Sequence, residues 1–97
     1  QFPNASIEVR GHTDNVPIKH SGWDSNWELS SARALAVVRY LINEEGFSKD
    51  KLRAVGMADT QPVASNSKAS GRKKNRRAEI IIRPESQTNT EEIEIQD

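Results

Sequence analysis

The sequence predicts a small α+β domain in which one helix packs on a short sheet to form a two-layer sandwich. Ile7-Glu8-Val9 alternates apolar and polar side chains, as a half-buried strand does. Apolar residues then recur at helical spacing, and a last apolar segment, residues 78–83, stops at Pro84. At 97 residues the chain is long enough for one domain with the order strand–helix–strand–strand.

The first strand is predicted at residues 5–10, and Gly11 is typical of the exit into a turn. Residues 11–24 contain repeated turn formers and read as one long loop. A loop of this length is uncommon in a small domain and is often functional.

The helix is predicted to begin after Ser25, because Ser25 and Glu28 fit a capping box, although Ser30 is a second candidate cap. It is predicted to end at Gly46, which suits a left-handed stop. Its apolar stripe comprises Ala34, Leu35, Val38, Leu41 and Ile42.

A second strand is predicted at residues 52–58, followed by a loop that runs to about Lys74 and the third strand at 78–83. We assign residues 1–84 to the domain and expect residues 85–97 to be an acidic, disordered tail. One helix and three short strands give a thin core. We therefore expect a neighbouring upstream element to complete the sheet.

The charges are arranged in blocks although 14 basic and 14 acidic side chains cancel. The net charge is −2 for residues 1–50, +7 for 51–84 and −5 for 85–97, so a polyanionic or polar polymer remains a suitable partner. The absence of cysteine excludes disulfides and thiolate chemistry. No apolar run of about 18 residues is present, which excludes a membrane span in this segment.

Asp14 and Arg33 form the first candidate binding pair. Asp14 follows a predicted strand closely, and Arg33 lies about 140° from Val38 around the helix, at about 100° per residue. Arg33 lies in the first turns of the predicted helix, where a cation is unfavourable because the helix dipole is positive there. A residue that breaks such a local rule often marks a functional site. The pair could hold a zwitterion, with an ammonium on the carboxylate and a carboxylate on the guanidinium. The alternatives are an internal salt bridge or two unrelated solvated charges.

Three sequence motifs contain these two residues or follow them along the chain. They are GHTDNVPI at residues 11–18, NWELSSARA at 26–34, and GR followed by NRRAEI within 71–80. Together with Gly56, Pro62 and Asn66, they resemble the OmpA-like peptidoglycan-binding domain over about residues 5–83. The NVPI extension and the long loop before Asn26 are most similar to the flagellar motor stator branch of that family.

The resemblance implies non-catalytic binding of cell-wall peptidoglycan in the bacterial periplasm. Asp14 would take the ammonium and Arg33 the carboxylate at the diaminopimelate end of the stem peptide. The other positions that match family pocket residues are Thr13, Asn26, Leu29, Arg76 and Arg77. For the arginine pair, the motif does not tell which member lines the pocket.

The resemblance also implies that this chain lacks the strand and helix with which the family domain begins. It implies anchoring of a membrane complex such as the motor stator, with a membrane-embedded stator partner and a homodimer as further expected partners. A generic OmpA-type or lipoprotein wall anchor outside the motor is the alternative.

Three other functions fit the residues less well. Residues 71–77 hold five basic side chains, so nucleic-acid binding through Arg72 to Arg77 is an alternative, but the few aromatics argue against it. His12, Asp14 and His20 are candidate metal ligands without an evident fourth, so no metal or cofactor is expected. No nucleophile elbow or paired carboxylates appear, so no enzyme is expected.

Overall fold

The computed structural model describes residues 5–18 and 22–84. In chain order its elements are β1 (Ser6–His12), α1 (Asn26–Asn43), a short 3-10 helix (Lys49–Lys51), β2 (Leu52–Gly56), α2 (Ala69–Asn75) and β3 (Arg77–Arg83). They form the predicted α+β sandwich. None of the helices in these two ranges has the length and apolar character needed to cross a bilayer.

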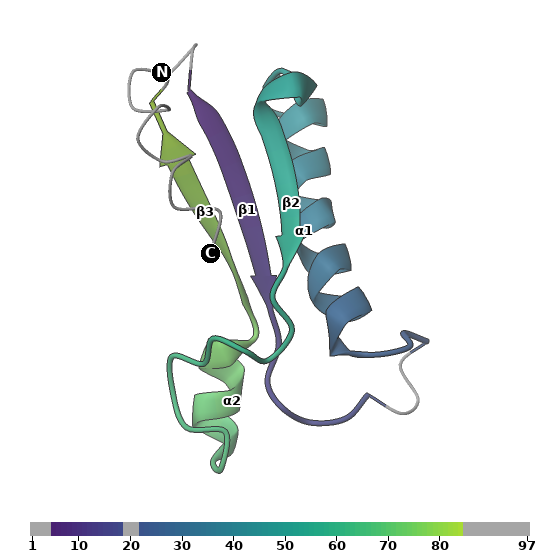
Figure 1. The fold of residues 1–97 in the computed structure, drawn as a ribbon, viewed down its shortest axis with the longest axis vertical. Coiled ribbons are helices and arrows are strands. Elements are labelled where there is room, and N and C mark those ends of the chain that lie inside the picture. The colour runs from purple at the N-terminus through teal and green to yellow at the C-terminus, as the bar shows by residue number, and fades with distance from the viewer. Residues whose placement is uncertain (1–4, 19–21, 85–97) are drawn as a thin grey trace, which may run out of the picture.

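β1 is the central strand of a three-stranded mixed sheet with the order β2-β1-β3. It runs parallel to β2 and antiparallel to β3, so that Val9 lies between Ala54 and Ile80. Parallel neighbours need a crossover connection, and α1 supplies it. Figure 1 shows that the C-terminal end of β1, the N-terminal end of α1 and the short helix α2 meet at one end of the sheet.

The apolar core lies between α1 and one face of the sheet. Ile7 and Val9 of β1 pack there with Ala34 and Val38 of α1. The helix approaches the sheet closely at Gly11, where an added Cβ would lie 2.0 Å from the carbonyl oxygen of Ser30. Glycine at the end of β1 therefore allows the first turns of α1 to sit directly against the strand that leads into the site.

The α1 side of β3 is left largely uncovered. Ile80 and Ile82 pair with Val9 and Ile7, so their side chains lie on the face that α1 packs against. They are nevertheless 51% and 45% exposed, because α1 lies mainly over β1 and β2. The expectation that a further element completes this sheet stays a prediction.

The predicted ends of α1 are confirmed. The Ser25 hydroxyl oxygen accepts a hydrogen bond from the backbone N–H of Trp27 and donates one to the Glu28 carboxylate, which together cap the first turn. After Asn43 the chain leaves the helix, and Gly46 adopts the left-handed conformation with φ of +75°.

Two expectations after β2 are wrong. The segment expected to be loop to about Lys74 contains α2, a helix of 7 residues. Its sequence is poor in apolar periodicity, and tertiary contact holds it instead: Gly71 is buried with its Cα against the backbone of Ser65. The strand expected to reach Ala58 ends at Gly56, because Ala58 has φ of +53°, outside the β region.

Ala58 is connected to α1 through Ser30. The Ser30 hydroxyl accepts a hydrogen bond from the Ala58 N–H at 2.9 Å and donates one to the carbonyl oxygen of Trp27 at 3.0 Å. Both Ser30 and Ala58 are buried. This bond fixes the exit of β2 against the first turns of α1 and supports the left-handed backbone at Ala58.

Replacing Ser30 by alanine is expected to lower the free energy of unfolding by about 1–3 kcal/mol, because the buried Ala58 N–H loses its acceptor. Urea denaturation followed by circular dichroism measures the change. Ser31→Ala is the matched control, since Ser31 is exposed and should change stability by no more than about 0.5 kcal/mol. Equal stability of the two variants would contradict the role given to the Ser30 hydroxyl.

Candidate functional site

The candidate site lies just beyond the C-terminal end of β1, beside the first turns of α1 and the C-terminal end of α2 (Figure 1). The polar side chains that the motifs singled out therefore come from three segments far apart in the sequence. β1 positions the segment that carries Thr13 and Asp14, since its hydrogen bonds to β2 and β3 fix both sides of the strand.

Asp14 is a nearly buried carboxylate with both oxygens engaged. The whole residue is only 8% exposed to solvent. Oδ1 accepts a hydrogen bond from the backbone N–H of Val16 at 3.0 Å. Oδ2 accepts one from Nη1 of Arg76 at 2.7 Å, which makes a charge-assisted ion pair.

The neighbouring residues hold the backbone around Asp14. The Thr13 N–H donates to the Ala58 carbonyl oxygen at 2.9 Å, and the Thr13 hydroxyl donates to the Asp14 carbonyl oxygen at 2.7 Å. Asn26 Nδ2 lies 3.4 Å from the carbonyl oxygens of Asp14 and Val16, so it joins the start of α1 to the loop. The aspartate is thus presented by a fixed backbone.

Arg33 reaches the same segment from α1. Its Nη1 donates to the carbonyl oxygen of His12, two residues before Asp14, at 2.5 Å. The guanidinium therefore lies beside the backbone segment that leads to Asp14. The alternative of an internal Asp14–Arg33 salt bridge does not describe the structure, in which Arg76 is the cation paired with Asp14.

The two consecutive arginines have different surroundings. Arg76 contacts Asp14, and its side chain is 43% exposed. Arg77 pairs with Glu79 at 2.8 Å and donates to the carbonyl oxygens of Asn75 and Gln61. The structure therefore brings Arg76 to Asp14 and directs Arg77 to the sheet, a distinction that the motif left open.

Asn75 is a functional neighbour that sequence reasoning missed. It is completely buried, and its Oδ1 accepts hydrogen bonds from the N–H groups of Val63 and Ala64. Its Nδ2 donates to the Ala64 carbonyl oxygen and to Oδ1 of Asn66. Asn75 thereby ties the loop after β2 to the residue that immediately precedes Arg76. Its place inside the NRR motif was the available signal.

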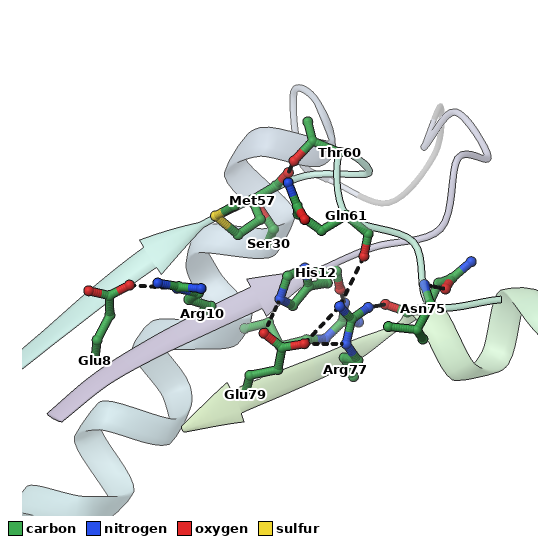
Figure 2. A network of polar contacts seen from close by, with 12 residues as sticks. Glu8, Arg10, His12, Ser30, Met57, Thr60, Gln61, Asn75, Arg77 and Glu79 are labelled. Atoms are coloured by element: carbon green, nitrogen blue, oxygen red, sulfur yellow. Dashed lines mark hydrogen bonds and ion pairs between the residues drawn. The ribbon is translucent and has the colours of Figure 1, made fainter. Parts of the chain in front are cut away.

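A charged network lies behind the site, on the face of the sheet away from α1. Figure 2 shows Glu79 between His12 and Arg77. Nε2 of the buried His12 lies 3.0 Å from Oε1 of Glu79, and the Arg77 guanidinium lies 2.8 Å from Oε2. Burial by itself raises the pKa of Glu79, but the hydrogen bonds and charges of Arg77 and His12 outweigh it and lower that pKa below its ordinary value of 4.5.

Leu29, the remaining candidate among the described residues, has an apolar side chain and makes no polar contact with Asp14. Leu29 is half-buried one turn after Asn26 and contributes apolar surface. His20 lies outside the described residues. Within the two described ranges, no group of three histidine, cysteine, aspartate or glutamate side chains could hold a metal ion, and His12 and Asp14 have separate partners.

An open hollow of about 600 Å³ lies on a different flank of α1. Its lining includes Trp23, Trp27, Leu35 and Arg39, but neither Asp14 nor Arg33. We place the candidate site at the end of β1 because opposite charges converge there on fixed backbone, whereas the hollow presents mainly apolar surface.

This fold is an α+β domain with charged side chains gathered at one end of its sheet, and sequence comparison shows its family. The OmpA family matches residues 1–76, so the chain belongs to the OmpA family. "Motility protein B" of Bacillus subtilis is 43% identical over 90 residues, which cover 93% of this chain and 34% of that protein. "Peptidoglycan-binding protein ArfA" of Mycobacterium tuberculosis is 38% identical over 80 residues, 82% of this chain and 23% of that protein.

A solved structure shares the fold over nearly the whole of this chain. The periplasmic domain of Helicobacter pylori MotB (residues 90–256) superposes with a TM-score of 0.79 and 31% identity over 97% of this chain and 57% of that one. The chain thus spans about a third or less of the two curated relatives. The predicted resemblance to the OmpA-like domain and to its flagellar stator branch is confirmed.

The lowered pKa of Glu79 predicts a specific acid dependence of stability. Since the pKa is lower in the folded chain than in the unfolded one, the ionised carboxylate stabilises the fold at pH above about 4.5. That contribution is lost as the pH falls through the folded pKa. Glu79→Gln should therefore lower stability at pH 7 and flatten the loss of stability below pH 4.5. Chemical denaturation at several pH values measures this, and parallel curves for variant and wild type would contradict it.

Proposed function

We propose that the chain is a non-catalytic peptidoglycan-binding domain that recognises the diaminopimelate end of a stem peptide. The observation that carries this proposal is that the buried Asp14 follows the end of β1 by two residues, while Arg33 donates to the carbonyl oxygen of His12 at that same end. The free end of diaminopimelate carries an ammonium and a carboxylate on one carbon. An acidic and a basic side chain on fixed backbone match that pair of charges.

The two residues have separate roles in this proposal. Asp14 receives the ligand ammonium through Oδ2, since Oδ1 is held by the Val16 N–H. Arg33 receives the carboxylate with the guanidinium hydrogens that its bond to the His12 carbonyl leaves available. Thr13 and Asn26 keep Asp14 in place, Leu29 adds apolar surface, and Arg76 lies at the rim of the site.

The relatives support the wider assignment. We infer that the domain works in the periplasm and anchors a membrane complex to the cell wall, as the likeness to Motility protein B and to the periplasmic domain of MotB suggests. For a motor stator, the wall is the fixed support against which an ion-driven unit pushes. In a motor stator, the expected partners are a membrane-embedded stator protein and a second copy of the chain.

A wall anchor outside the motor is the second candidate. The likeness to ArfA supports it, because that relative is named for peptidoglycan binding and not for motility. The same ligand chemistry would serve both hosts. The nucleic-acid alternative loses support from the contacts of the basic run, since Arg72, Arg76 and Arg77 are each bonded within the domain.

Asp14→Ala and Arg33→Ala are each expected to weaken binding of a diaminopimelate-containing muropeptide by about 1.5–3 kcal/mol, because each removes one charge-assisted contact. Isothermal titration calorimetry on the purified chain measures the loss. Arg33→Lys should also weaken binding, since an ammonium cannot reproduce the two-pronged contact.

Arg39→Ala provides the matched control, because Arg39 is an exposed cation of the same helix that lines the hollow away from the site. Circular dichroism must show an unchanged helical signal in every variant. Wild-type affinity in both the Asp14→Ala and the Arg33→Ala chains would reject the site.

A further inference from the structure

Arg76 already occupies the place that an ammonium ligand needs. Asp14 Oδ1 is taken by a backbone N–H and Oδ2 lies 2.7 Å from Arg76 Nη1. Asp14 is only 8% exposed as a whole residue, so little of its carboxylate surface is left for a third hydrogen-bond donor. An incoming ammonium must therefore displace Arg76 from Oδ2 or share that oxygen with it.

The charges of the site do not balance on a simple zwitterion. Asp14 contributes −1, while Arg33 and Arg76 contribute +1 each, which gives +1. Arg33 is bonded to a neutral carbonyl and does not offset this excess. A ligand that brings one ammonium and one carboxylate adds no net charge. It would satisfy Arg33, but the ligand ammonium and Arg76 would then compete for the single Asp14 carboxylate.

Arg76 is free to take a new partner, whereas its neighbour is not. Its backbone is fixed as the C-cap of α2, directly after the buried Asn75. Its side chain is 43% exposed, and the bond to Asp14 is its contact with the site. Arg77, by contrast, is tied to Glu79, to Gln61 and to Asn75 (Figure 2).

We propose that Arg76 is a specificity-determining residue that exchanges Asp14 for a second carboxylate of the ligand. The proposal rests on the proposed function and adds a requirement to it. The preferred stem peptide carries, besides its zwitterionic end, another carboxylate in the free form. An amide at that place is neutral, and its NH2 group presents donors to a guanidinium that has only donors. The site therefore discriminates against stem peptides amidated at that carboxylate.

Three synthetic peptides test this by calorimetry. They are L-Ala-γ-D-Glu-diaminopimelate and its two monoamides that keep the zwitterionic end intact. Wild-type chain is expected to bind one monoamide about tenfold or more weakly than the free acid, the size of one charge-assisted contact. Arg76→Gln should bind the acid and that monoamide equally, and should bind the monoamide within about threefold of the wild type.

Lys74→Gln is the matched control, because it removes the same charge from an exposed position two residues away. It should retain the wild-type preference for the free acid. Lost discrimination in Lys74→Gln would mean that the general positive field of this end of the domain, and not Arg76, selects the ligand, and would overturn the proposal.

Two further outcomes would overturn it. Equal binding of all three peptides by the wild type would show that no second carboxylate is read. Arg76→Gln binding all three more tightly by one common factor would show that Arg76 only competes for Asp14. Failure of the proposed function is distinct, since then the wild-type chain binds none of the peptides.

Discussion

The site depends on one chain of hydrogen bonds that crosses the end of the sheet. The Ser30 hydroxyl accepts from the Ala58 N–H, and the Ala58 carbonyl accepts from the Thr13 N–H. These two bonds join α1, the exit of β2 and the residue before Asp14. Ala58 makes both bonds with its backbone at φ of +53°. A local cost in backbone strain thus accompanies the fixed position of the loop that carries the proposed site.

The same end of the domain carries two sets of ion pairs with different surroundings. On the face of the sheet away from α1, the Glu79 carboxylate contacts both Arg77 and His12, so its negative charge is offset within the fold. In front, Asp14 forms an ion pair with Arg76, and Arg33 donates a hydrogen bond to the His12 carbonyl oxygen. The first arrangement favours stability, and the second is the one for which we propose an exchange of partners on ligand binding. The two adjacent arginines of one motif therefore have different surroundings, because Arg76 is the C-cap of α2 and Arg77 is the first residue of β3.

The sequence was informative where a pattern is local. Ser25 and Gly46 predicted the ends of α1, and the alternation around Ile7 and Val9 predicted β1, since capping and alternation depend on near neighbours. β1 extends to His12, two residues beyond its predicted end, because Gly11 and His12 still pair with β3. α2 could not be predicted, because Gly71 and Asn75 stabilise it through contacts with residues 63–66. The pairing of Asp14 with Arg76 instead of Arg33 also lay beyond the sequence, because 62 residues separate the partners and only the antiparallel register of β1 and β3 brings them together.

The most direct measurement is a crystal structure of the 97-residue chain bound to L-Ala-γ-D-Glu-diaminopimelate. We expect the ligand ammonium within hydrogen-bond distance of Asp14 Oδ2 and the adjacent carboxylate on the Arg33 guanidinium. Arg76 should have left Asp14 for another ligand carboxylate. A peptide seated in the hollow beside Trp23 and Trp27, with the Asp14–Arg76 pair intact, would contradict it.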